Sequence, residues 1–79
     1  MREKKEFTVL SFTTTTDAMA MEQYCKEQKI PGRTIPLPPA ISAGCGIAFR
    51  METEDAKRYA KALYGAPVSF ESHEVFLYV

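Results

Sequence analysis

Cys45 is the residue of this sequence best placed for chemistry, because it lies between two glycines, Gly44 and Gly46. The thiolate of a cysteine is its nucleophilic and group-carrying form, and glycine neighbours leave the sulfur uncrowded. The same Gly-Cys-Gly segment also fits a tight turn that holds a small buried hydrophobic residue. The spacing of these residues supports both interpretations about equally.

The second cysteine, Cys25, and the single histidine, His73, are weaker candidates. By its spacing, Cys25 shares one helix face with Ala18 and Met21, and cysteines on apolar faces are usually inert core residues. His73 has no second histidine to pair with, so we interpret it as a solvated side chain. A metal site or a Cys-His pair would need a distant contact, and we expect no metal and no cofactor.

Two arginines and a run of threonines are possible anion-binding groups. Arg33 and Arg50 could help to bind an anion near the expected sheet, although single arginines beside strands are most often solvated. The threonines at 13–16 precede an expected helix, whose first free amides form another possible anion site. Thr14 and Asp17 fit the capping-box pattern, which places the start of that helix at about Thr15.

The elements that must position these residues follow from hydrophobic patterning and turn signals. The second helix has a cap at Thr53 and stops before Gly65, and the first stops at Pro31-Gly32. The pattern predicts, in order, strand, helix, strand, strand, helix and strand over residues 7–12, 15–28, 34–38, 46–52, 54–63 and 75–79.

This order of elements is typical of an α+β, ferredoxin-like βαββαβ fold, in which a four-stranded antiparallel sheet carries two helices on one face. Strands one and three lie at the centre of such a sheet. Pro36 and Pro38 have no amide proton on one side of strand two, so we expect that strand at an edge, with the proline nitrogens facing solvent.

The topology brings the loop that contains Cys45 close to the start of the first helix. A helix N-terminus favours the thiolate over the thiol, so we predict Cys45 as the catalytic residue. The groups expected to bind an anion or to stabilise the thiolate are Thr13, Thr14, Thr15, Gly44 and Gly46.

Length and composition limit the partners. We expect residues 1–79 to form a single domain, whose small core favours a homo-oligomer such as a dimer. Ten basic and ten acidic residues cancel, so nucleic acid is not expected as a partner. No apolar stretch has the length of a signal peptide or a membrane span, and two cysteines are too few for a secreted disulfide framework. These features predict a cytoplasmic protein with free thiols.

Three segments together resemble a known family: Val9-Leu10-Ser11-Phe12 with the threonines and Asp17-Ala18-Met19-Ala20-Met21-Glu22 that follow, Ile35-Pro36-Leu37-Pro38, and Gly44-Cys45-Gly46-Ile47-Ala48-Phe49-Arg50. They are similar to the selenium/sulfur carrier protein-like family of small bacterial proteins, a domain of unknown function. The resemblance covers nearly the whole chain. In that family a serine or a second small residue directly precedes the cysteine, whereas Ser42-Ala43-Gly44 precedes Cys45 here.

The resemblance implies that Cys45 accepts sulfur or selenium from a donor protein, as a persulfide or selenylsulfide, and passes it to an acceptor protein. Such a chain would be a carrier or accessory protein more than a stand-alone enzyme. The alternative is a non-catalytic ligand-sensing or dimerisation module. The fold alone does not separate these two functions.

Overall fold

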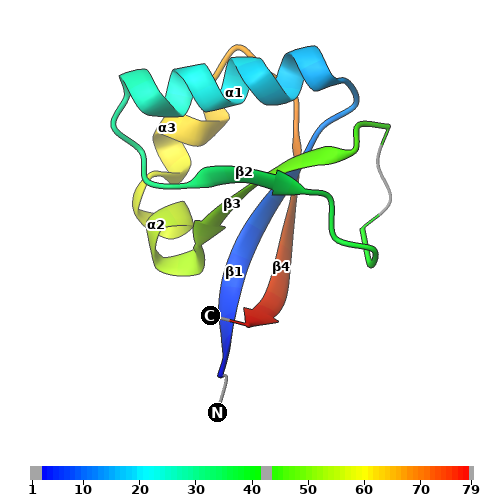
Figure 1. Ribbon diagram of the computed structural model, residues 1–79. Helices are drawn as coiled ribbons and strands as arrows, with labels where there is room; N and C mark the ends of the chain where they lie inside the picture. Colours follow the sequence, from blue (N-terminus) through cyan, green and yellow to red (C-terminus); the bar gives the residue numbers. More distant parts are fainter. Residues whose placement is uncertain (1–2, 42–43, 79) are drawn as a thin grey trace.

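The computed structural model, which describes residues 3–41 and 44–78, contains one four-stranded sheet and three helices (Figure 1). The elements are β1 (Lys4–Ser11), α1 (Thr15–Glu27), β2 (Arg33–Pro36), β3 (Ile47–Glu52), α2 (Thr53–Arg58), α3 (Ala60–Tyr64) and β4 (Glu71–Tyr78). The strands lie in the order β2-β3-β1-β4, and each neighbouring pair is antiparallel. The predicted α+β class with an antiparallel sheet is therefore confirmed. Among the described residues, no helix is long and apolar enough to cross a bilayer.

The main core lies between the sheet and the helices. Alternation along the strands turns one set of side chains toward the helices, and Leu10 of β1 and Phe49 of β3 belong to this set. On α1, the buried residues are Ala18, Met21 and Cys25, the apolar face that their spacing predicted.

The opposite face of the sheet carries a second, smaller cluster. Val9 and Ala48, from the two central strands, pack there with Ile41, which comes from the segment that follows β2. All three residues are buried, so this segment covers part of the sheet. We call this side of the sheet, opposite the helices, the open face.

Local backbone interactions fix both ends of α1. The Thr14 hydroxyl accepts a hydrogen bond from the amide of Asp17 at 3.2 Å, so the predicted cap is present. At the other end, Lys29 adopts a left-handed φ of 58°, and the amide of Ile30 donates to the carbonyl of Cys25 at 2.8 Å. These contacts form a Schellman-type end, so the helix stops before the proline-glycine pair that was predicted to end it.

The edge position of β2 confirms the prediction from its prolines. The amide of Leu37 donates to the carbonyl of Gly46 at 2.9 Å, and hydrogen-bonding sides alternate along an antiparallel strand. The nitrogen of Pro36 therefore lies on the side away from β3, where it removes no bond from the sheet. Pro38 lies beyond the end of the strand.

The second helix and the last strand differ most from their predictions, while β1 and β2 differ only in their bounds. The second helix is divided into α2 and α3 at Tyr59, whose φ of −102° and ψ of 14° leave the helical range. The predicted cap at Thr53 is wrong, because Thr53 is the first residue of α2 and its hydroxyl instead accepts a hydrogen bond from Thr8 at 3.3 Å. The last strand begins at Glu71, earlier than predicted, because it pairs with β1 as far as Ser11.

Candidate functional site

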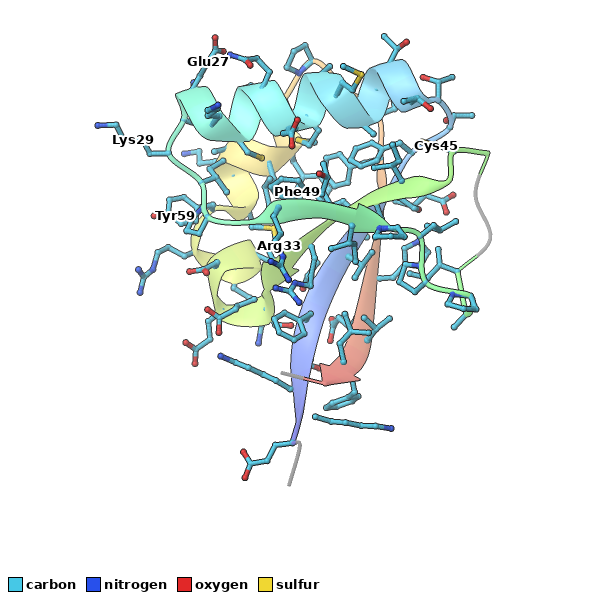
Figure 2. All side chains as sticks on the ribbon, viewed as in Figure 1. Glu27, Lys29, Arg33, Cys45, Phe49 and Tyr59 are labelled. Carbon is cyan, nitrogen blue, oxygen red and sulfur yellow. The ribbon has the colours of Figure 1, made fainter. Side chains whose placement is uncertain are left out.

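Cys45 lies in the loop that leads into β3, beside the start of α1 (Figure 2). Its amide donates to the carbonyl of Phe12 at 3.2 Å, which ties this loop to the end of β1. The chain turns from β1 into α1 at the same point, so the turn and the loop are in direct contact. Cys45 therefore occupies the position that the predicted topology assigned to it.

Two polar groups contact the Cys45 sulfur. The Thr15 Oγ1 atom lies 3.6 Å from Sγ, and the amide of Ile47 donates to Sγ at a distance of 3.4 Å. The amide of Ile47 and the N-terminus of the 13-residue helix α1 both place the positive ends of backbone dipoles near the sulfur. The contribution of Ile47 was missed in the sequence, because it depends on how the loop folds back into β3.

The Cys45 side chain is nevertheless buried, with an exposed fraction of only 3%. It belongs to the main core, together with Phe12 and Ala18. The flanking glycines therefore do not leave the sulfur open to solvent. The sulfur is therefore not within reach of another protein in this conformation.

The two glycines beside Cys45 have different roles. A Cβ atom at Gly44 would lie 2.6 Å from the carbonyl oxygen of Thr13, closer than real contacts allow. Gly44 is therefore needed for the close approach between the loop and the turn after β1. A Cβ atom at Gly46 would meet no atom within 4 Å, so packing does not require a glycine at that position.

The three predicted threonines also differ in what they contact. The hydroxyl of Thr14 is used as the cap of α1, and Thr13 packs its carbonyl against Gly44. The only contact of these threonine side chains with Cys45 that the structure records is that of Thr15. The three are therefore close together, but their hydroxyl groups do not converge on one point.

Cys25 has the surroundings of an inert thiol. Its side chain is 1% exposed on the inner face of α1, and burial raises the pKa of the Cys25 thiol to about 11. The described part of the chain contains no group of three His, Cys, Asp or Glu side chains that could hold a metal ion.

His73 is not simply solvated, as the sequence suggested. Its Nε2 atom forms a hydrogen bond of 2.9 Å with the hydroxyl of Ser11, a buried residue at the end of β1, and lies 3.9 Å from a carboxylate oxygen of Glu71. Ser11 and Glu71 also line a cavity of about 300 Å³ that reaches Gly44, the neighbour of Cys45. The other lining residues are Phe12, Thr13, Ser69 and Phe70.

Residues 7–73 match the model of a family described as "Putative Se/S carrier protein-like". The chain belongs to this family. The match includes both cysteines, the threonine turn and the loop of Cys45, so the resemblance noted in the sequence is confirmed. Neither the curated proteins nor the solved structures contain a match to this Se/S carrier-like chain.

Proposed function

We propose that this chain is a sulfur or selenium carrier in which Cys45 holds the transferred atom as a persulfide or selenylsulfide. The observation that carries the proposal is the setting of the Cys45 sulfur, which accepts a hydrogen bond from the amide of Ile47 and lies beside the hydroxyl of Thr15 at the start of α1. The family match over residues 7–73 supports the same function. Both cysteines are free, as a carrier thiol must be.

The transfer step is an exchange at sulfur that needs no external oxidant. The Cys45 thiolate attacks the outer sulfur of a persulfide on the donor protein and forms a new S–S bond. The S–S bond of the donor breaks, and its electron pair leaves with the donor thiolate. Delivery to the acceptor is the same exchange with the acceptor thiolate as the nucleophile. With selenium, the attacked atom is the outer selenium.

The burial of Cys45 places a condition on this step. The attacking sulfur must come within reach of a partner's sulfur, so the loop around Gly44 has to separate from Thr13 during transfer. The cavity that reaches Gly44 supports an approach from the side of Ser11 and Glu71. After transfer, a return of the loop would protect the bound sulfur from other thiols.

Incubation of the full chain with a cysteine desulfurase and cysteine, followed by intact mass measurement, tests the proposal. The expected result is the gain of one sulfur atom, which a reductant removes. Cys45→Ser should prevent the gain, and Cys25→Ser should not. Absence of loading in the wild-type chain, or loading that survives Cys45→Ser, would reject the carrier function and favour a non-catalytic ligand-sensing or dimerisation module.

The proposal has three further parts. We propose a ferredoxin-like fold, which the central positions of β1 and β3 support. The partners are a donor and an acceptor protein, so the chain acts as an accessory protein and not as a stand-alone enzyme. Its location is the cytoplasm, whose reducing conditions keep thiols such as Cys25 and Cys45 free.

A further inference from the structure

Arg33 of β2 and Arg50 of β3 are direct partners in the antiparallel register. Side chains of directly opposite residues lie on the same face of the sheet, about 5 Å apart at Cβ, where two like charges destabilise the pair. Alternation along β3 puts Arg50 on the side of Ala48, which is the open face. Figure 2 shows Phe49 on the α1 side of the sheet and Arg33 on the opposite side. Two positive charges therefore share one small area of the open face.

Neither arginine forms a direct ion pair with a carboxylate of the described residues. Among residues 3–41 and 44–78, the ion pairs within 4.0 Å are Lys5 with Glu52 and His73 with Glu71, so neither arginine is in one. Glu52, which lies two residues after Arg50, is thus bound by Lys5. No direct ion pair in this part of the chain therefore offsets the repulsion between the two arginines.

The guanidinium group of Arg50 lies over an aromatic ring. Its guanidinium carbon lies 4.5 Å from the centroid of the Phe7 ring, a cation-π contact, and Phe7 itself is buried. A guanidinium that lies over a ring keeps its N–H groups in its own plane, where they remain available to an acceptor. The contact with Phe7 therefore leaves the N–H donors of Arg50 available.

Both arginines line one cavity of about 240 Å³. Gly32 forms part of its wall, with a φ of 152° that favours glycine, and a Cβ atom there would lie 2.4 Å from the Phe49 ring. The remaining lining residues are Phe7, Pro31, Met51, Glu52 and Asp55. The cavity thus combines two guanidinium groups with an aromatic side chain and a closely packed backbone segment.

We propose that Arg33 and Arg50 together bind one oxyanion group of a small molecule, either a carboxylate or a phosphoryl group. The planar fork of a guanidinium matches the oxygens of both groups, and an anion between the two arginines replaces their repulsion with two attractive contacts. Asp55 lies on the same cavity and opposes the anion. Arg50 is five residues beyond Cys45, about 17 Å along an extended chain, so this site is independent of the sulfur-transfer proposal.

Titration of the uniformly ¹⁵N-labelled full chain, followed by amide chemical shifts, tests the site. Sodium phosphate, sodium acetate and sodium chloride are compared at equal ionic strength. The expected result is a saturable shift of the amides of Gly32, Arg33 and Arg50 with phosphate or acetate but not with chloride. The anion that saturates at the lower concentration identifies the group as phosphoryl or carboxylate.

Variants of three residues that line the cavity, with a fourth as control, make the test specific. Arg33→Gln and Arg50→Gln should each weaken binding about tenfold or more, because each removes charge-assisted hydrogen bonds. Asp55→Asn should strengthen binding a few-fold, because it removes an opposing charge. Arg58→Gln, at the end of α2, is the matched control and should leave binding unchanged.

Equal shifts with chloride, or binding that Arg33→Gln leaves unchanged, would overturn the proposal. If Arg50→Gln loses its fold because Arg50 packs on Phe7, the exposed Arg33 still provides the decisive variant. Failure of this test would not affect the loading of Cys45, and failure of loading would not affect this titration.

Discussion

The sulfur of Cys45 lies 3.6 Å from the hydroxyl oxygen of Thr15, the first residue of α1. These residues are 30 positions apart in the sequence, and the sheet brings them together. β1 leads directly into α1 through the threonine turn, and the loop before β3 is tied to the end of β1 at Phe12. The contact joins the candidate nucleophile to a helix start that favours negative charge.

The first prediction concerns the hydroxyl of Thr15. Thr15→Val keeps the shape of the side chain but removes the group that can donate to the Cys45 sulfur, so the thiolate loses a stabilising contact. A hydrogen bond of this kind is worth about 0.5–1.5 kcal/mol, so alkylation of Cys45 at neutral pH should slow by about twofold to tenfold. Thr16→Val, at the exposed next position, should leave the rate unchanged. Equal rates in both variants would show that the hydroxyl does not stabilise the thiolate.

Those features of the site that depend on local sequence or on the order of elements could be predicted. The cap at Thr14 was visible because it involves residues three apart in the chain. The closeness of Cys45 to α1 followed from the alternation of strands and helices, which sets the end of the sheet at which each loop lies. The edge position of β2 followed from Pro36, which lacks an amide proton.

Other features depended on contacts that sequence patterns do not contain. The glycines beside Cys45 describe its local chain, but its burial is decided by Phe12 and α1, which pack over it. The pairing of Arg33 with Arg50 depends on the register of β2 and β3. A shift of one residue in that register would separate the two arginines. His73 was interpreted as solvated because its partner, Ser11, is 62 residues away in the sequence.

The second prediction separates the two glycines. Gly44→Ala places a methyl group against the carbonyl oxygen of Thr13, so the loop must shift to relieve the contact. By analogy with overpacked cores, we expect the free energy of unfolding to fall by about 1–3 kcal/mol. Gly46→Ala meets open space and should change the free energy of unfolding by less than about 0.5 kcal/mol. Urea unfolding followed by circular dichroism measures both values. A similar loss in both variants would show that the loop does not pack on the turn as described.

The third prediction concerns self-association through the open face. Val75 and Leu77 are half-buried on that face, in the cluster of Val9, whereas Phe76 lies on the other side of β4 and is 66% exposed. We expect a dimer that buries the part of the open face around Val75 and Leu77, and light scattering at tens of micromolar should detect it, since this is a typical range for weak association. Leu77→Asp should give a monomer, and Phe76→Asp, the matched change on the opposite side, should not. If only Phe76→Asp loses the dimer, the interface lies on the other face of the sheet. If the wild-type chain is a monomer, the predicted dimer does not form.

The fourth prediction is a pH dependence of stability caused by Cys25. Burial raises its pKa from an ordinary value of 9.0 to about 11, so between these pH values the folded chain holds a proton that the unfolded chain has lost. The contribution of Cys25 to the free energy of unfolding is fully present below pH 9. It should fall by an amount on the order of 2 kcal/mol as pH rises to about 11.

Urea unfolding at several pH values between 8 and 11 measures this loss, and Cys25→Ala identifies its source. The difference in unfolding free energy between wild type and Cys25→Ala should shrink as pH rises through the window around the two pKa values. Cys45→Ala is the matched control and should retain the loss. A constant difference between wild type and Cys25→Ala would show that Cys25 does not titrate as its burial implies.

The last prediction is that alkylation by iodoacetamide at neutral pH modifies Cys45 before Cys25. Both side chains are buried, with exposed fractions of 3% and 1%, so the rate of each depends on how easily its surroundings open and on how readily the thiol ionises. Cys25 lies on the inner face of α1 and must lose its proton against a raised pKa, so it should react only when the helix detaches. Cys45 lies in a loop, next to a glycine with open space around it, and its sulfur already accepts a hydrogen bond from the amide of Ile47. Peptide mapping of the alkylated native chain gives the order, with Cys45→Ser as the control for the assignment. If Cys25 reacts first, or if both react together at the rate of global unfolding, the loop does not expose Cys45 and transfer of sulfur through this residue loses its physical basis.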